Sequence, residues 1–356
     1  MMEKTLPEVC IIQYGFPFDS SKFCSAEGVP LVRIRDVVRG YSETYTTEIA
    51  GENYIVNDGD LLIGMDGEFN IAYWKGGRAY LNQRVCRLIP REDVDRDYIF
   101  YYMPQALKAI EDATPFVTVK HLSAKQLSKI LIPLPDMSEQ QRISAVLRSV
   151  DRVIAMRKKE LDELNNLVKS RFIELFGDQT ANPYAWQQTS IGACCTLKSG
   201  TSLPADRENE GGAIPYVKVG DMNYPGNEQY ITTSSRFVSE QTAGTGVFPV
   251  GTVVFPKRGG AIGTNKKRLT RIPICADLNV MGVTAGRRLT PQYLMAYFNT
   301  VDLGTLNNGS SVPQINNKDI APLLICIPPM ALQEQFAAFV EQTDKSKLCG
   351  KMGVAA

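Results

Sequence analysis

Residues 138–176 read SEQQRISAVLRSVDRVIAMRKKELDELNNLVKSRFIELF, and this stretch decides the architecture of the chain. Along it, one set of positions steps alternately by four and three residues: Ile143, Leu147, Val150, Ile154, Arg157, Leu161, Leu164, Val168, Arg171 and Leu175. This heptad spacing is typical of a helix that pairs with another helix along its length. We therefore predict one unbroken helix, which spans about 58 Å at ~1.5 Å per residue. A spacer of this length indicates two sites whose separation matters.

Two arginines interrupt the apolar positions of this predicted helix. Arg157 and Arg171 can lie within the helix pairing surface, where polar residues fix register and partner at a cost in stability. Alternatively, a small rotation of the helix places Met156 and Phe172 there instead. The sequence leaves both arrangements open.

Composition limits the class of protein. A chain of 356 residues with 44% hydrophobic content predicts about two domains with real cores. Eight scattered cysteines without C-x-x-C spacing and a single histidine argue against zinc, so no metal site is expected. The sequence shows neither a long apolar run nor a secretory signal, and we expect a cytoplasmic protein. The net charge of +1 gives no overall basic field.

The two halves of the chain repeat each other. When Pro135 is placed on Pro328, the flanking residues match without a gap, including Gln140 on Gln333 and Asp151 on Asp344. Upstream, PLVRIRD at 30–36 corresponds to PYVKVGD at 215–221, and DGDLLIG at 58–64 corresponds to VGTVVFP at 250–256. The matching segments occur in the same order, which indicates a duplicated domain.

Each half contains strand patterns followed by a helical pattern. In the first half we predict strands at 31–38, 60–65, 83–88 and 130–134 and a helix at 97–111. In the second half we predict strands at 214–219, 251–256, 279–284 and 323–327 and a helix at 291–300. The predicted fold class is therefore α+β, with two similar globular domains joined by a long coiled-coil helix and a second, shorter C-terminal helix.

The repeat predicts a second long helix after Met330, but its heptad pattern stops near Lys347. We predict domains at 1–136 and 179–330, a central helix at 137–178, a truncated helix at 331–347 and a tail at 348–356. The shortened second helix leaves much of the apolar surface from Ile143 to Leu175 without a partner in the same chain.

The PDMSEQQRI sequence at 135–143, the VKSRFIELFG sequence at 168–177 and the repeated GDLLI turn resemble the specificity subunit of type I restriction-modification enzymes. The resemblance covers residues 28 to 347. It implies two target-recognition domains that each read half of a bipartite DNA sequence, and helices that set the spacing and bind the adenine methyltransferase subunits. It also implies that the chain is not an enzyme: S-adenosylmethionine, ATP and Mg²⁺ belong to the methyltransferase and restriction subunits.

The residues themselves agree that catalysis by this chain alone is not expected. A Walker loop is absent, and RGGAIG at 258–263 lacks the glycine spacing of a dinucleotide turn. Asn182-Pro-Tyr184 superficially resembles the base-holding motif of adenine methyltransferases, but a second proline and a glycine-rich strand are missing. His121 has no paired nucleophile at a recognisable spacing, so we interpret it as a loop residue.

Candidate DNA contacts are cations and planar amides in loops that follow the predicted strands, because cations bind phosphates and amides read base edges. In the first half these are Arg33, Arg35, Arg39, Gln83, Arg84 and Lys120. In the second half they are Lys257, Arg258, Lys266, Lys267, Arg268, Arg271, Gln314 and Asn316. For any one of them an ordinary solvated loop is equally plausible.

Candidate partner-binding residues are the apolar heptad positions of the central helix: Ile143, Leu147, Val150, Ile154, Leu161, Leu164, Val168 and Leu175. They are expected to bind methyltransferase subunits or, through self-dimerisation, a second copy of the chain. Three alternatives to the DNA-binding adaptor remain at this point: a coiled-coil dimerisation scaffold without DNA specificity, a truncated and inactive variant of the specificity subunit, and an enzyme that acts unaided.

Overall fold

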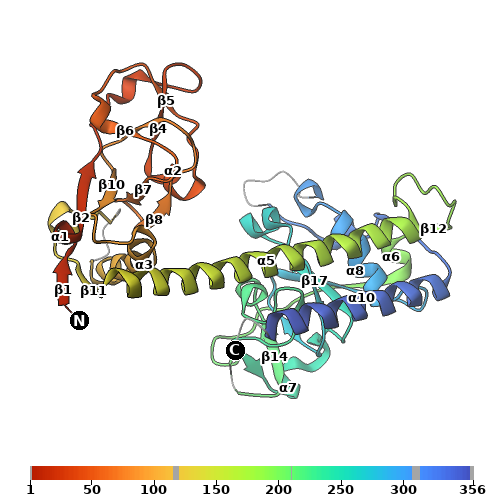
Figure 1. The fold of residues 1–356 in the computed structure, drawn as a ribbon. Helices are drawn as coiled ribbons and strands as arrows, with labels where there is room; N and C mark the ends of the chain where they lie inside the picture. Colours follow the sequence, from red (N-terminus) through yellow and green to blue (C-terminus); the bar gives the residue numbers. More distant parts are fainter. Residues whose placement is uncertain (1, 115–119, 210, 307–312, 353–356) are drawn as a thin grey trace. The chain divides into compact units, whose positions relative to one another are not determined.

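The computed structural model describes residues 2–114, 120–209, 211–306 and 313–352 (Figure 1). The chain divides into two compact units, Met1–Ala155 (unit 1) and Met156–Ala356 (unit 2). The division falls inside one continuous helix, α5 (Met137–Phe176), so each unit contains part of it. This confirms the single long helix that the heptad pattern predicts.

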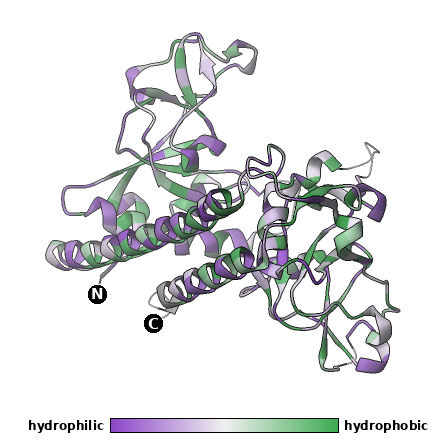
Figure 2. Ribbon diagram, turned by 90° about the vertical axis from the view of Figure 1, so that its right-hand side faces the viewer, coloured by the Kyte–Doolittle hydropathy of each residue, from purple (hydrophilic) through white to green (hydrophobic). Residues whose placement is uncertain are grey.

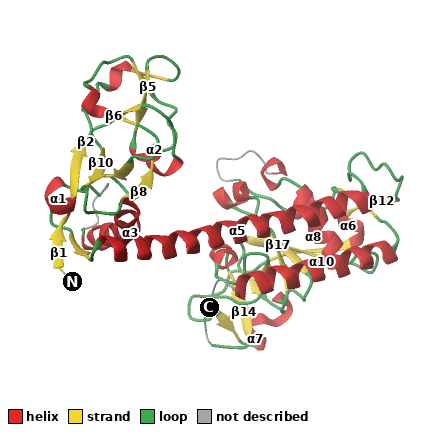
Figure 3. Cartoon of the chain, viewed as in Figure 1, coloured by secondary structure: helices red, strands yellow, loops and turns green. Residues whose placement is uncertain are grey.

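Unit 1 is built from small sheets with helices beside them (Figure 3). Its four-stranded antiparallel sheet has the order β2 (Cys10–Tyr14), β10 (Val85–Pro90), β7 (Leu61–Gly64), β8 (Asn70–Tyr73). A five-stranded sheet has the order β3 (Phe23–Cys24), β5 (Tyr45–Thr46), β4 (Val29–Val32), β9 (Ala79–Leu81), β6 (Ile55–Val56). β1 (Met2–Thr5) pairs with β11 (Leu131–Leu134). The helices are α1 (Leu6–Val9), α2 (Ile34–Arg39), α3 (Arg96–Ala113) and α4 (Ala124–Leu127), with 3₁₀ turns η1 (Ser20–Lys22) and η2 (Glu52–Tyr54).

Unit 2 repeats this arrangement. Its five-stranded sheet has the order β13 (Cys195–Ser199), β20 (Val280–Ala285), β17 (Thr252–Pro256), β18 (Arg268–Thr270), β15 (Tyr230–Ile231). A three-stranded sheet has the order β16 (Phe237–Val238), β14 (Ile214–Val217), β19 (Cys275–Ala276). β12 (Gln188–Ser190) pairs with β21 (Leu324–Cys326). The helices are α6 (Ile191–Cys194), α7 (Glu240–Ala243), α8 (Pro291–Thr300), α9 (Asn317–Ile320) and α10 (Met330–Met352), with 3₁₀ turns η3 (Val219–Asn223), η4 (Gly244–Gly246), η5 (Gly259–Thr264) and η6 (Leu303–Leu306).

Strand register confirms the duplication. Leu61 of β7 pairs with Leu88 and with Tyr73, and its counterpart Val253 of β17 pairs with Val283 and with Leu269. The fold class predicted from the sequence, two similar α+β domains with one long and one shorter helix, is therefore confirmed. α5 has 40 residues and α10 has 23.

A buried glutamine fixes each long helix to its own unit. The Gln140 side chain accepts from Asp95 N (2.8 Å) and donates to the carbonyls of Asp93 (3.2 Å) and Pro135 (2.9 Å). Gln333 does the same with Thr290 N (2.9 Å), Arg288 O (3.0 Å) and Pro328 O (2.9 Å). Both side chains are fully buried, so each amide must find protein partners, and these bonds set where the helix leaves the sheet.

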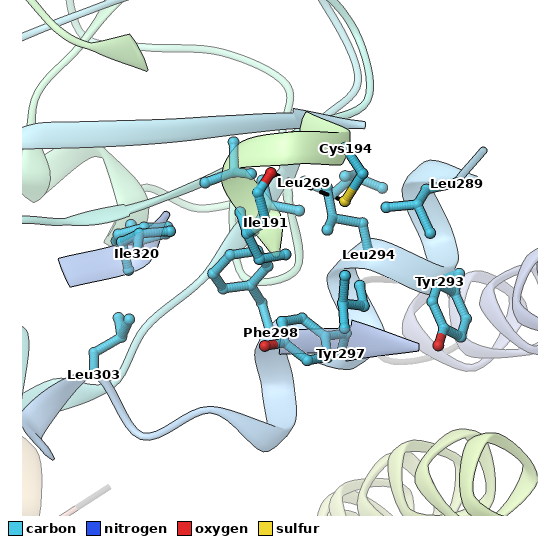
Figure 4. Close-up of a cluster of buried hydrophobic side chains, with 14 of the residues drawn as sticks. Ile191, Cys194, Leu269, Leu289, Tyr293, Leu294, Tyr297, Phe298, Leu303 and Ile320 are labelled. Atoms are coloured by element: carbon cyan, nitrogen blue, oxygen red, sulfur yellow. Dashed lines mark hydrogen bonds between the residues drawn. The ribbon is translucent and has the colours of Figure 1, made fainter. Parts of the chain in front are cut away.

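The largest core of unit 2 includes the second half of α5. Phe172 and Phe176 lie 5.6 Å from Phe336 of α10, measured between ring centroids, and Tyr293 of α8 packs against both α5 rings. Figure 4 shows the part of this core formed by α8, α6 and their neighbours, with Tyr293, Leu294, Tyr297 and Phe298 on one helix. Aromatic clusters of this kind bury much apolar surface and dominate core energetics.

Phe172 and Arg171 resolve the choice that the heptad pattern left open at the end of α5. Phe172 is buried, whereas Arg171 is half-buried, pairs with Glu174 (2.7 Å) and lies over the Phe339 ring. Earlier in the helix, Met156 is exposed, and the exposed Arg157 pairs with Glu160 (2.5 Å). The helix therefore turns Phe172 inward in unit 2 and leaves Met156 in solvent.

Three of the predicted elements are wrong in extent. The strands predicted at 31–38 and 214–219 end at Val32 and Val217, because Asp36 and Asp221 accept from the backbone N–H groups of Arg33 (2.9 Å) and Lys218 (2.7 Å) and start helical turns. The C-terminal helix predicted at 331–347 begins at Met330 and continues past Lys347 to Met352. Gly350 costs only about 1 kcal/mol in a helix that is already nucleated upstream.

Candidate nucleic-acid interface

In unit 1 two loops are joined by backbone hydrogen bonds next to the end of β7. Gly67 N donates to Lys120 O (2.9 Å), and Leu122 N donates to Met65 O (2.7 Å). Between these bonds Asp66 and His121 face each other as an isolated antiparallel bridge. We call this pair of loops the loop junction of unit 1.

Unit 2 has the same junction after β17. Gly259 N donates to Pro313 O (2.8 Å), Ile315 N donates to Lys257 O (2.9 Å), and Arg258 and Gln314 form the bridge between them. The glycine after each bridge has a left-handed φ, +74° at Gly67 and +69° at Gly259. A positive φ is readily adopted only by glycine, so the two segments make the same turn at equivalent positions.

The side chains on the two junctions differ although the backbones agree. In unit 1, Asp66 accepts from His121 Nδ1 (2.5 Å) and pairs with Arg84 (3.5 Å), while Arg84 lies 3.2 Å from His121 Nδ1. Arg84 and His121 are about half exposed and the Asp66 side chain is 20% exposed, so the cluster presents mainly a guanidinium and an imidazole to solvent. Of this cluster the sequence predicted only Arg84. The alignment of the two halves could have found Asp66 and His121, because it places them opposite Arg258 and Gln314.

In unit 2, Arg258 is exposed, and among the described residues its guanidinium makes no hydrogen bond or ion pair. Gln314 is half-buried and donates to Asn316 Oδ1 (2.8 Å). Within the described part of the chain, no atom lies within 4 Å of a Cβ added at Gly259, Gly260 or Gly263. The predicted residues Arg258, Gln314 and Asn316 are thus brought together.

Three other predicted cations of unit 2 point into the protein. Lys257 is buried and donates to Ser199 Oγ (2.9 Å), and burial lowers its pKa. Lys267 is buried and donates to Asn265 Oδ1 (2.8 Å) and Val301 O (2.6 Å), and burial lowers its pKa to about 8. Arg268 donates to the carbonyls of Asn227 (2.6 Å) and Lys267 (2.9 Å). The side chains of all three cations therefore already donate hydrogen bonds to groups inside unit 2.

The remaining predicted cations of unit 2 lie nearer the surface. Lys266 is half-buried and bonds Asn223 Oδ1. Arg271 is exposed, lies 3.9 Å above the Tyr230 ring and pairs with Asp344 of α10 (3.6 Å). Arg271 thus ties a sheet edge to the C-terminal helix.

In unit 1 most of the predicted cations have acidic, polar or aromatic neighbours. Arg33 lies 5.8 Å from the Phe23 ring centroid, Arg35 donates to Thr44 Oγ1 (3.1 Å), and Arg39 pairs with Glu43 (3.4 Å). Lys120 donates to Glu111 O (2.5 Å). Gln83 is exposed beside Arg84. Arg33 directly precedes α2 and Arg35 and Arg39 lie in it. Gln83, Arg84 and Lys120 instead adjoin the loop junction.

The apolar positions of α5 separate into two groups. In the part belonging to unit 1, Leu147 and Val150 are exposed, together with Val146 and Val153, while Ile143 and Ile154 are half-buried. In the part belonging to unit 2, the predicted partner-binding residues are all half-buried: Leu161, Leu164, Val168 and Leu175. Of these, Val168 and Leu175 pack on the core of unit 2. Figure 2 shows the mixture of hydrophilic and hydrophobic positions along the helix.

The comparison with known families agrees with this duplicated arrangement. Residues 1–166 and 183–349 match the family described as type I restriction modification DNA specificity domain. The chain belongs to this family. The two matched segments cover most of the chain and correspond to its two halves.

Curated relatives are specificity subunits of type I restriction enzymes. The chain is 40% identical over 167 residues to the EcoBI specificity subunit of Escherichia coli, covering 46% of this chain and 35% of the relative. It is 24% identical over 290 residues to the MjaIX specificity subunit of Methanocaldococcus jannaschii, covering 73% of this chain and 65% of the relative. The matches therefore span about a third and about two thirds of these relatives' own lengths.

Solved structures share the fold. The chain is similar to the S subunit of a type I restriction-modification system from M. genitalium, with a TM-score of 0.58, 14% identity and coverage of 99% of this chain and 92% of that one. A second chain, from a study of type I R-M complex assembly, gives a TM-score of 0.55 at 18% identity with the same coverage.

Within the described part of the chain, no helix has the length and apolar character needed to cross a membrane.

Proposed function

We propose that this chain is the DNA-reading subunit of a type I restriction-modification enzyme. Each unit contacts one half of a bipartite duplex target through its loop junction, and α5 sets the spacing between the halves. Methyl transfer, translocation and cleavage belong to methyltransferase and restriction subunits, which hold S-adenosylmethionine, ATP and Mg²⁺. A cytoplasmic location is part of this proposal.

The observation that carries the proposal is one scaffold used twice with different side chains at the same place. Asp66 and His121 in unit 1 occupy the bridge that Arg258 and Gln314 occupy in unit 2. A duplicated backbone that keeps its geometry and changes its polar side chains is suited to reading two different half-sites, because base edges are distinguished by donor and acceptor pattern.

The exposed guanidinium groups near the junctions, Arg84 in unit 1 and Arg258 in unit 2, support contact with DNA. Eight other predicted residues remain proposed DNA contacts of the surrounding surface: Arg33, Arg35, Arg39, Gln83, Lys120, Lys266, Arg271 and Asn316. Lys257, Lys267 and Arg268 are not carried forward as phosphate contacts, because their polar atoms already bind groups inside unit 2.

The chain and its methyltransferase subunit, purified together, test the proposal with a library of random duplexes about 40 base pairs long. Repeated binding and sequencing are expected to enrich two short blocks separated by a fixed unread gap. Enrichment of no sequence between 50 and 200 mM salt would contradict the proposal and favour a scaffold without DNA specificity. Methylation of DNA by the isolated chain with S-adenosylmethionine would show instead that it is an enzyme acting unaided.

The exposed apolar residues of α5 in unit 1 are the proposed docking site of a methyltransferase subunit. Val146, Leu147, Val150 and Val153 place four apolar side chains on one stretch of helix, and such contiguous exposed patches mark protein interfaces. A mass measurement by light scattering, with and without the methyltransferase, tests this. A complex of one chain with one or two methyltransferase subunits would support this docking site. A stable dimer of the isolated chain that excludes the methyltransferase would instead favour pairing of two copies through α5.

A further inference from the structure

We propose that the bridge residues of the loop junctions determine base preference, and that they make the two half-sites different from each other. Arg258 is assigned to a guanine and Gln314 to a neighbouring adenine in the half-site of unit 2, whereas Arg84, held by Asp66, reads the half-site of unit 1. The assignment rests on the proposed function and adds which side chains carry the sequence information.

Backbone hydrogen bonds establish that the two junctions are equivalent. Met65 and Lys257 each accept from the residue after the bridge, at 2.7 and 2.9 Å, and Gly67 and Gly259 each donate to the residue before it, at 2.9 and 2.8 Å. A third bond completes the match, because Met65 N donates to Arg84 O (3.0 Å) and Lys257 N donates to Asn279 O (2.8 Å). Asp66 therefore corresponds to Arg258, His121 to Gln314 and Arg84 to Asn279.

The chemistry of the two sets is complementary to different base edges. Arginine donates two bonds to the O6 and N7 of guanine, and glutamine or asparagine pairs with the N6 and N7 of adenine. Unit 2 offers the exposed guanidinium of Arg258 beside the amides of Gln314 and Asn316. Unit 1 offers the guanidinium of Arg84 from the position that asparagine holds in unit 2, and an acid where unit 2 has Arg258.

Local packing explains how these side chains are oriented. Asp66 accepts from His121 Nδ1 and pairs with Arg84, so the acid fixes both neighbours, and a guanidinium paired in this way keeps other N–H groups for a base. In unit 2 no atom of the described residues lies within 4 Å of a Cβ added at Gly259, Gly260 or Gly263, which favours close approach of a nucleic acid to the backbone of this turn. Gly67 is likewise open in unit 1.

The experiment uses the full chain with its methyltransferase subunit and the same random duplex library. Arg258→Ala is expected to reduce the preference for guanine at one position of one block about tenfold or more, with the other block unchanged. Arg84→Ala is expected to act on the other block alone. Arg287→Ala is the matched control, an exposed arginine of unit 2 outside the junction, and should leave both blocks unchanged.

Arg258→Lys separates base reading from phosphate contact. The substitution keeps the positive charge but loses the bidentate donor geometry of the guanidinium. The preference for guanine should therefore fall, while total DNA affinity stays within about threefold of wild type. If both blocks fade together in Arg258→Ala, or if Arg258→Lys keeps the guanine preference, Arg258 is a phosphate contact and the assignment is overturned.

Failure of the inference and failure of the proposed function are distinguishable. A wild-type chain that enriches no sequence overturns the proposed function. A wild-type chain that enriches two blocks whose base preferences survive both Arg258→Ala and Arg84→Ala overturns only the assignment of the junctions. Arg258 and Arg84 are solvent-accessible, and the thermal unfolding of each variant, compared with wild type, verifies that a lost preference reflects a folded protein.

Discussion

The two long helices, α5 and α10, start alike and end differently. Leu147 of α5 is 37% exposed, but its counterpart Val340 of α10 is 7% exposed. Val150 is 48% exposed, and its counterpart Thr343 is 5% exposed. The difference arises because the second half of α5, with Phe172 and Phe176, covers the start of α10 in unit 2.

No described segment of unit 1 plays that covering part. The same buried glutamine attaches both helices, Gln140 in unit 1 and Gln333 in unit 2, so the attachment belongs to the repeated domain. The cover belongs to the neighbouring helix and is present in unit 2 alone. A repeated sequence therefore yields one covered helical face and one exposed apolar face.

The largest expected effect is at the covered face. Phe336→Ala removes a fully buried ring that contacts Phe172 and Phe176, and should lower the free energy of unfolding of unit 2 by about 3 to 5 kcal/mol. Its half-buried counterpart Ile143→Ala should cost unit 1 about 1 to 2 kcal/mol. Hydrogen exchange read peptide by peptide measures each unit separately. Equal losses would contradict the difference in cover.

The shared attachment should respond alike in both units. Gln333→Leu and Gln140→Leu each leave one backbone donor and two carbonyls without their side-chain partner, and about 3 kcal/mol is expected in either case. The same exchange measurement applies. A neutral result in one unit and a large loss in the other would break the equivalence of the two attachments.

A buried lysine distinguishes the sheet of unit 2 that contains β17 and β18 from the sheet of unit 1 that contains β7 and β8. Arg268 pairs with Val254 as Ala72 pairs with Leu62, so Lys267 stands where unit 1 has Ile71. Burial lowers the pKa of Lys267 to about 8, so the folded chain holds fewer protons than the unfolded chain between that value and the ordinary lysine pKa. Burying the charged ammonium therefore lowers the free energy of unfolding by its full amount below pH 8. This loss diminishes as the pH rises toward the ordinary lysine pKa.

Lys267→Ile should remove this pH dependence. The stability of wild type relative to the variant is expected to rise by about 2 kcal/mol from pH 7 to pH 9.5, measured by urea unfolding. Lys267 and Met295 both line a cavity of about 910 Å³. Met295→Ile, an uncharged change in that lining, is the control and should show no such trend. A flat difference for Lys267→Ile would mean that its ammonium is solvated.

The smallest effect on stability is expected at the open face. Leu147→Gln and Val150→Gln change exposed side chains and should alter the free energy of unfolding by no more than about 0.5 kcal/mol. They should nevertheless weaken binding of the methyltransferase subunit at least tenfold in a titration. Unchanged binding would show that this apolar face is not the docking site.

Much of the fold follows from local sequence patterns. The heptad from Ile143 to Leu175 predicts α5 because its period is a property of the chain itself, and the offset that places Gln140 on Gln333 predicts the duplication. The ends of elements were less predictable. The strand after Pro30 gives way to α2 because one buried acid, Asp36, caps the backbone, and apolar alternation does not reveal a cap.

The candidate site needed the tertiary structure. Lys257, Lys267 and Arg268 look like Arg258 in the sequence, yet the first three bind groups inside unit 2 and only Arg258 faces solvent. His121 looked isolated until the backbone bonds of the junction placed it beside Asp66 and Arg84.

The sequence by itself determined that there are two similar units and one long helix, because periodicity and repetition are properties of neighbouring positions along the chain. Tertiary structure decided which charges are free and which helical face is covered. Both depend on the packing of segments distant in sequence, such as Phe336 against Phe172 and the bridge between Arg258 and Gln314. Burial fixes whether a charged group is solvated or must find a partner within the protein, and only the folded chain shows this.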